Sequence, residues 1–188
     1  MPGWDNAAKA RTWLTDNPAP DVILLDIRMP GMSGVVFLKE LAGLAAGVPV
    51  IVITNQAGIA RGHFTLEALL GIHERMAREL TERGAMVDGI YFCPHAPDAG
   101  CDCRKPALGN FQRAAREHDL DLARSAMIGD RESDVRAAQA MGGLGVLVRT
   151  GYGQTEVARL HEWDGHQPAF IADDLAEAVA WWLTKRET

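Results

Sequence analysis

Five short runs of apolar residues place the strongest constraint on how this chain can fold. Runs that lack alternating polar residues are typical of parallel strands covered on both faces. Segments with helical spacing of apolar residues separate them, so the sequence predicts an α/β fold with an open, mostly parallel sheet. The predicted strands are Val22–Leu25, Val48–Thr54, Gly89–Phe92, Ala126–Gly129 and Gly145–Arg149, with Phe170–Ile171 as a short edge strand.

The segments between these runs predict helices. Thr65 can cap the helix predicted over residues 65–83, and Gly84 can end it. In the last helix, apolar residues recur on one side and predict a core-facing stripe of Leu175, Val179, Trp182 and Leu183. The predicted helices cover residues 5–16, 35–44, 65–83, 107–118, 132–141 and 173–185.

The overall composition restricts the class of protein and of partner. A chain of 188 residues with 47% hydrophobic content suits one domain with a sizeable core. A formal net charge of −6 argues against nucleic acid as the main partner. We find no signal peptide and no apolar run long enough to span a bilayer, so we expect a cytoplasmic monomer that acts on a small molecule.

Four polar residues are expected at the carboxyl edge of the sheet, where open parallel sheets bind ligands. Asp26, Thr54 and Asp130 follow three of the strands, and Lys105 follows the strand at residues 89–92 after a loop. Such a set suits phosphoryl transfer to an aspartate. Asp26 would attack phosphorus, Thr54 and Lys105 would hold its oxygens, and Asp130 with Asp26 would bind Mg²⁺. Asp134 would support the metal or orient Lys105.

Each of these residues has a plainer interpretation when taken alone. Thr54 suits a strand end, Asp130 a helix N-cap and Lys105 a solvated surface cation. A purely structural role is least suitable for Asp26, because a carboxylate at the end of such an apolar strand needs a cation or hydrogen-bond donors nearby.

The segment from Cys93 to Pro106 contains every cysteine of the chain. Three thiols and one imidazole, at Cys93, His95, Cys101 and Cys103, form a full tetrahedral set for a structural zinc ion. The alternatives are a disulfide, which would be strained in Cys-x-Cys and would leave one thiol over, and three unliganded cysteines in a polar turn.

From about residue 50 onward the chain resembles the haloacid-dehalogenase (HAD) superfamily, and within it the zinc-loop phosphatases of heptose bisphosphate and histidinol phosphate. The resemblance covers nearly three quarters of the chain and is carried by four short segments. They are Val52–Gly62, Cys93–Pro106, Gly129–Asp134 and Val146–Gly151.

This resemblance implies a Rossmann-like three-layer sandwich with a minimal cap, and an Mg²⁺-dependent phosphatase that uses a phosphoaspartate. It assigns the phosphate to Thr54 and Lys105, and contacts with the sugar phosphate to Asn55 and Arg104. It assigns Mg²⁺ to the positions of Asp26, Arg28, Asp130 and Asp134.

The first quarter departs from that family. The family opens with Asp-x-Asp and a long flap, whereas this chain has Asp26-Ile27-Arg28 and no flap. Residues 21–34 and 48–54 instead resemble two strands of a response-regulator receiver domain, although the receiver's first strand and acidic metal pair are absent. We interpret residues 5–54 as a receiver-like βαβ portion within one HAD-like domain, joined near residues 50–54.

Arg28 stands where the family keeps its general acid, and arginine cannot donate its proton at neutral pH. The sequence therefore predicts weak turnover of alkyl phosphates. Two other interpretations stay open: a module that accepts phosphate on Asp26 and binds a partner, and an inactive fold that holds zinc.

Overall fold

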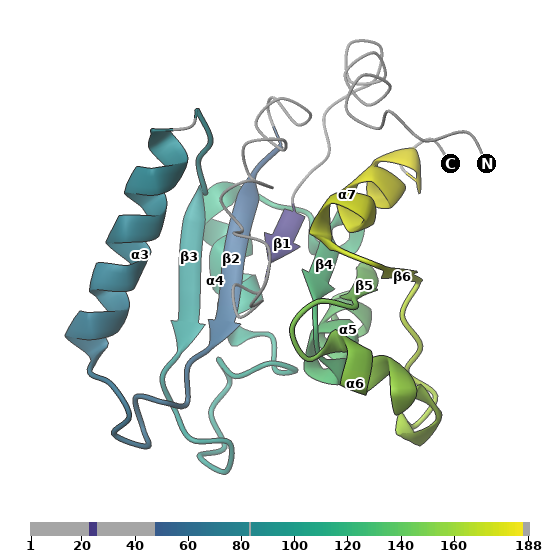
Figure 1. Ribbon diagram of the computed structural model, residues 1–188, viewed down its shortest axis with the longest axis horizontal. Helices are drawn as coiled ribbons and strands as arrows, with labels where there is room; N and C mark the ends of the chain where they lie inside the picture. The colour runs from purple at the N-terminus through teal and green to yellow at the C-terminus, as the bar shows by residue number, and fades with distance from the viewer. Residues whose placement is uncertain (1–22, 26–47, 83, 186–188) are drawn as a thin grey trace.

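The strands lie side by side and run in one direction. The computed structural model describes residues 23–25, 48–82 and 84–185 (Figure 1). Within these ranges the strands form one parallel sheet in the order β3-β2-β1-β4-β5-β6. Their bounds are β1 Ile23–Leu25, β2 Val50–Asn55, β3 Gly89–Cys93, β4 Ala126–Gly129, β5 Leu144–Val148 and β6 Phe170–Ala172.

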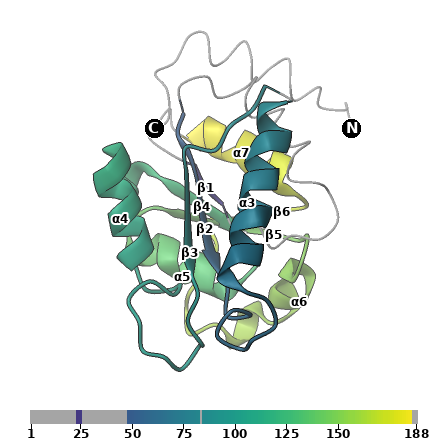
Figure 2. The same ribbon diagram turned by 90° about the vertical axis from the view of Figure 1, so that its left-hand side faces the viewer.

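Helices cover both faces of this sheet, as the view along its edge shows (Figure 2). Residues of α3 and α7 pack on one face, and residues of α4 and α5 on the other. The helices are α3 Leu66–Thr81, α4 Gly109–His118, α5 Glu132–Ala140, α6 Gly153–Ala158 and α7 Leu175–Thr184, with 3₁₀ turns at Leu122–Arg124 and Leu160–Glu162.

Two main cores form because successive strand residues point to opposite faces. In β2, Val50 belongs to the core beneath α3 and α7, whereas Ile51 and Ile53 belong to the core beneath α4 and α5. In β4, Ile128 and Met127 divide in the same way. Burial on both faces explains why these strands have continuous apolar sequences.

Several predicted features are confirmed. Thr65 caps α3, since its side chain accepts a hydrogen bond of 3.1 Å from the backbone N–H of Ala68. All four residues of the predicted stripe on α7 are buried. The edge strand β6 is present where Phe170–Ile171 predicted it.

Other elements differ from the prediction. The helix expected from residue 107 begins at Gly109, because the preceding residues belong to the loop. The helix α6 was not predicted, since six residues are too few to show a helical period. Val22 and the helices predicted over residues 5–16 and 35–44 lie outside the described residues.

The adjacent residues Trp181 and Trp182 allow a test of the core beneath α7. Trp182 is 1% exposed, whereas Trp181 is only partly buried and stacks on Phe170 with ring centroids 4.8 Å apart. We expect Trp182→Ala to lower the free energy of unfolding by about 3–5 kcal/mol, the usual cost of truncating a core aromatic residue. Urea denaturation checks this, with Trp181→Ala as the control. An equal loss for both variants would contradict the described packing.

Candidate active site and metal centre

Two of the predicted site residues, Thr54 and Asp130, lie at the carboxyl ends of β2 and β4, on either side of β1. Leu25, the last residue of β1, pairs with Val52 of β2 on one side and with Ile128 of β4 on the other. Thr54 and Asp130 each lie two residues beyond these pairs, so they flank the end of β1 at similar heights. Both side chains are fully buried.

Lys105 reaches this edge from the loop that follows β3. Its Nζ lies 2.9 Å from Oδ1 of Asp134, and both side chains have no exposed surface. The same Nζ donates a hydrogen bond of 2.5 Å to the carbonyl oxygen of Ile53, the residue before Thr54. The interpretation of Lys105 as a solvated surface cation is therefore wrong, because a buried ammonium is fixed beside the end of β2.

Asp134 comes from the first turn of α5. Its Oδ2 accepts a hydrogen bond of 3.0 Å from the backbone N–H of Arg131, the N-cap residue at the start of α5. One carboxylate therefore contacts both the helix terminus and Lys105. This geometry fits the expected role in orienting Lys105, whereas its role in the metal shell stays a prediction.

Asp130 is not the N-cap of α5, since Arg131 occupies that position. The Oδ2 atom of Asp130 instead accepts a hydrogen bond of 2.9 Å from the backbone N–H of Tyr152, in the turn after β5. The interpretation of Asp130 as a helix cap is therefore wrong. Its carboxylate is oriented by a second loop.

The charges at this edge suit a cation. Among the described residues, the buried charged side chains are Lys105, Asp130 and Asp134, which leaves an excess of negative charge. Carboxylate oxygens are the ligands that Mg²⁺ prefers. The residues present therefore fit a magnesium ion held by Asp130, with Asp26 as the second ligand that the sequence predicts.

Thr54 and Asn55 differ in what their side chains contact. The hydroxyl of Thr54 accepts a hydrogen bond of 3.1 Å from Nε2 of Gln56, so its own proton can be donated to an anion. The amide of Asn55 accepts from the Lys105 N–H at 3.0 Å and donates to the Lys105 carbonyl at 3.2 Å. Asn55 thus ties the loop to the end of β2, and its predicted contact with substrate stays a prediction.

Arg104 precedes Lys105 and is partly buried. Its Nη1 atom is buried and has no hydrogen-bond partner among the residues that the structure describes. A buried donor without a partner costs free energy, which an anionic ligand would recover. This observation fits the contact with a phosphate group that the sequence predicts for Arg104.

The four predicted zinc ligands converge in the same loop. The Sγ atom of Cys93 lies 3.6 Å from Sγ of Cys101 and 3.6 Å from Nδ1 of His95, and this Nδ1 lies 3.3 Å from Sγ of Cys103. All four donor atoms lie within 4.8 Å of one another. Tetrahedral bonds to zinc of about 2.3 Å for sulfur and 2.0–2.1 Å for nitrogen require separations of roughly this size.

Two of the thiols have shifted pKa values. Burial raises the pKa of Cys103 to about 12, together with hydrogen bonds and negative charge from Cys93 and Cys101. Burial acts in the same direction on Cys101, but hydrogen bonds from Cys93, Cys103 and the backbone of Arg104 lower its pKa to about 7. Zinc binds thiolates, so a bound ion would displace the protons of these two thiols. The donor set therefore fits zinc.

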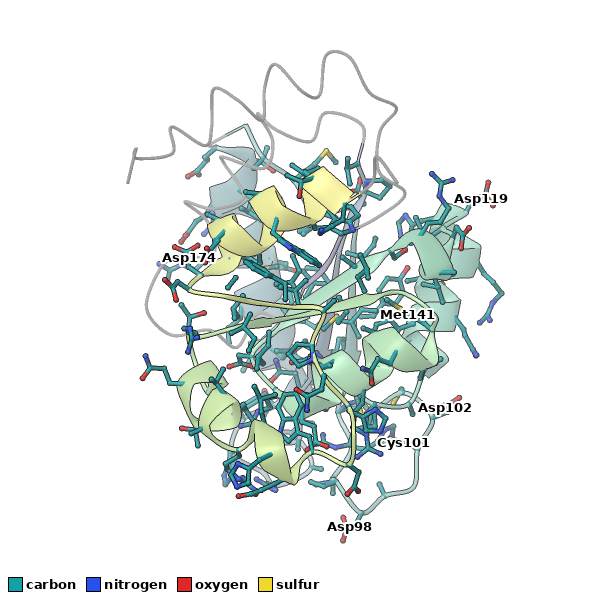
Figure 3. All side chains as sticks on the ribbon, turned by 90° about the vertical axis from the view of Figure 1, so that its right-hand side faces the viewer. Asp98, Cys101, Asp102, Asp119, Met141 and Asp174 are labelled. Carbon is teal, nitrogen blue, oxygen red and sulfur yellow. The ribbon has the colours of Figure 1, made fainter. Side chains whose placement is uncertain are left out.

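Backbone and amide contacts join the zinc loop to the fold. The carbonyl of Cys93 accepts from the N–H of Gln56 at 2.7 Å, and the carbonyl of Cys103 accepts from Nδ2 of Asn110 at 3.1 Å. Figure 3 shows Asp98 at the outer tip of this loop, farther from the sheet than Cys101. The loop therefore presents Arg104 and Lys105 from a support anchored to β2 and α4.

Two predicted residues lie outside the described residues: Asp26, which follows β1 in the sequence, and Arg28. Their roles stay predictions. The turn at residues 150–153, which contacts Asp130, was given no role by the sequence analysis. The sequence signal that could have indicated this turn was the pair Gly151 and Gly153 shortly after a predicted strand.

Comparison with known proteins identifies the family. The D-glycero-beta-D-manno-heptose-1,7-bisphosphate 7-phosphatase of Bordetella bronchiseptica is 44% identical over 155 residues, which cover 82% of this chain and 82% of that protein. The chain belongs to the HAD-like hydrolases. The model of HAD-hydrolase-like proteins matches residues 102–178. The relatives are named phosphatases, which places this HAD-like hydrolase among the phosphoric monoester hydrolases.

Other relatives agree with this assignment. The enzyme of the same name from Pseudomonas aeruginosa is 40% identical over 156 residues, which cover 83% of this chain and 84% of that protein. A crystal structure of D,D-heptose 1,7-bisphosphate phosphatase from B. bronchiseptica, complexed with magnesium and phosphate, superposes with a TM-score of 0.75. It is 33% identical and covers 88% of this chain and 99% of that chain.

The amino-terminal part of this HAD-like hydrolase matches a second family. The model of the response regulator receiver domain matches residues 2–70. The predicted resemblance of the first quarter to a receiver is thus confirmed at the level of sequence. No helix among the described residues has both the length and the apolar character needed to cross a bilayer.

The zinc assignment predicts a measurable metal content. We expect metal analysis of the purified protein to return about one zinc ion per chain. Cys101→Ala should lose the zinc and lower the melting temperature, because metal binding contributes folding free energy in such loops. Asp98→Ala, an exposed change in the same loop, should keep the metal. Unchanged thermal stability of the wild type in excess chelator would contradict the assignment.

The buried ion pair predicts a large effect of a single charge. Asp134→Asn keeps the shape of the side chain but removes the negative charge next to Lys105. We expect a loss of about 3–5 kcal/mol in the free energy of unfolding, as for other buried pairs with one partner removed. Asp173→Asn is the control, because this carboxylate is 84% exposed and pairs with Arg149 at the surface. If urea denaturation gave the same loss of unfolding free energy for both variants, the buried pair would contribute no more to stability than the surface pair.

Proposed function

We propose that this protein is an Mg²⁺-dependent phosphatase of a small sugar phosphate, of the heptose 1,7-bisphosphate type, that acts through a phosphoaspartate on Asp26. The observation that carries the proposal is the fixed ammonium of Lys105 beside Thr54, with the carboxylate of Asp130 across β1. The identity to named heptose-bisphosphate phosphatases supports the substrate class.

The described residues supply the binding of the phosphoryl group. Lys105 offers a positive charge that cannot move away, because its Nζ is tied to Asp134 and to the carbonyl of Ile53. Thr54 offers a hydroxyl proton, and Arg104 offers a buried N–H donor that has no partner in the described part of the chain. Donors fixed in advance at positions where negative charge develops are an effective means of stabilising a transition state. Bound Mg²⁺ would offset the charge of the phosphoryl oxygens.

The proposed reaction has two steps. An oxygen of Asp26 bonds to phosphorus while the bond from phosphorus to the sugar oxygen breaks, and the departing oxygen must gain a proton. Water then attacks the phosphoaspartate, which releases phosphate and restores Asp26. Arg28 can neither supply the proton in the first step nor activate water in the second.

A second candidate function is a phosphoryl-accepting module. The match of residues 2–70 to the receiver domain and the arginine at position 28 favour it. Such a module would form the same phosphoaspartate and turn over slowly. The two functions therefore share the site and differ in the fate of the intermediate.

Steady-state release of phosphate tests the proposal. Heptose 1,7-bisphosphate, histidinol phosphate and an aryl phosphate serve as substrates, with and without Mg²⁺. We expect Mg²⁺-dependent release, fastest with the aryl phosphate because its leaving group needs no proton. Absence of release from all three, together with a stable phosphoryl adduct after treatment with acetyl phosphate, would favour the phosphoryl-accepting module instead.

The substitution Arg28→Asp tests the missing general acid. A carboxyl group at this position should raise turnover of the sugar phosphate by roughly 10²–10⁴-fold, the usual contribution of general acid catalysis. The aryl phosphate should gain much less. Arg116→Asp on α4 is the control for the change in net charge, since this residue is exposed and remote from the carboxyl edge of the sheet. Equal rates for wild type and Arg28→Asp on both substrates would show that residue 28 is not at the acid position.

A further inference from the structure

The turn that follows β5 is in direct contact with the site. The backbone N–H of Tyr152 donates a hydrogen bond of 2.9 Å to Oδ2 of Asp130, so the turn orients the carboxylate that would bind the metal. The side chain of Asp130 is fully buried, and Tyr152 is 22 residues away in the sequence. The loops after two adjacent strands, β4 and β5, are therefore joined at this point.

The two glycines of the turn allow this approach. Gly151 has a φ of +63°, and a Cβ at this position would collide with Oδ2 of Asp130. A Cβ on Gly153 would collide with the carbonyl oxygen of Val148, at the end of β5. The backbone thus passes so close to the carboxylate and to the strand that side chains are excluded at both positions.

A second contact joins the same two loops. The guanidinium carbon of Arg131, the residue after Asp130, lies 3.7 Å from the centre of the Tyr152 ring. Arg131 also lies 3.8 Å from Glu156 of α6, measured from Nη1 to Oε1. Tyr152 therefore contacts two consecutive residues of the β4 loop, one through its backbone and one through its ring.

We propose that the Gly151–Gly153 turn is the positioning element of the metal site, with the N–H of Tyr152 fixing the orientation of Asp130 toward Mg²⁺. The proposal rests on the proposed function, since it takes Asp130 as a metal ligand. Groups that orient a ligand from outside the first shell commonly change metal affinity by about 10–100-fold when they are lost.

Gly151→Ala tests the proposal, with Gly165→Ala as a matched control. Both glycines have positive φ, +63° and +76°, so both variants suffer the same backbone strain. Only the Cβ at position 151 would meet Asp130, because nothing lies within 4 Å of the Cβ position at residue 165. The first readout is the rise in melting temperature with added MgCl₂, which does not require turnover. The second is the Mg²⁺ concentration for half-maximal hydrolysis of an aryl phosphate.

We expect Gly151→Ala to need roughly 10–100-fold more Mg²⁺ in both measurements, and Gly165→Ala to match the wild type. Equal Mg²⁺ dependence of the two variants, with a normal response in the wild type, would overturn the positioning role alone. Absence of any Mg²⁺-dependent shift in the wild type would overturn the metal site itself, and with it the proposed function.

A second pair of variants separates the N–H from the ring, and serves if Gly151→Ala does not fold. Tyr152 has a φ of −84°, which proline can approach, so Tyr152→Pro removes the N–H as well as the ring. Tyr152→Leu removes the ring alone. The proposal expects the larger loss of Mg²⁺ affinity for proline. Equal losses would assign the effect to the contact of the ring with Arg131 and overturn the role of the N–H.

Discussion

The buried ion pair between Lys105 and Asp134 is the interaction on which the rest of the site depends. An ammonium without exposed surface requires a compensating charge close by, and Asp134 supplies it at 2.9 Å. Because Asp134 also accepts a hydrogen bond from the N–H of Arg131 at the start of α5, and Lys105 also bonds to the carbonyl of Ile53, this pair joins the start of one helix to the end of a central strand. The ion pair and the hydrogen bond offset part of the cost of burying both charges, and they fix the position of the ammonium.

The loop at residues 93–106 explains how a lysine from outside the sheet reaches this position. Its three thiols and one imidazole converge to the spacing that a tetrahedral ion requires, and the loop is anchored by hydrogen bonds at its two ends. Asn55 then pairs with the backbone of Lys105, so the end of β2 sets the position of the residue that stands two places after Cys103, the last predicted zinc ligand. The predicted zinc ligands and the predicted phosphate-binding residues therefore share one loop.

Much of this arrangement could be predicted from sequence, and the limits have physical reasons. Continuous apolar runs are local signals, so the parallel strands and the polar residues at their ends could be found. The four predicted zinc ligands lie close together in the chain, so their convergence could be predicted for the same reason. The contact of Tyr152 with Asp130 could not, because it joins residues of two different loops through a backbone N–H, which leaves no mark on side-chain chemistry. The choice between a buried and a solvated Lys105 likewise depended on packing that no local pattern encodes.

The central claim is that this HAD-like hydrolase receives a phosphoryl group on Asp26. Treatment with acetyl phosphate and Mg²⁺, followed by borohydride reduction and peptide mapping by mass spectrometry, tests it most directly, because borohydride converts an aspartyl phosphate to homoserine. The account predicts homoserine at position 26, only in the presence of Mg²⁺, and much less of it in a Lys105→Ala variant. Homoserine at another carboxylate such as Asp130, or at none, would contradict it.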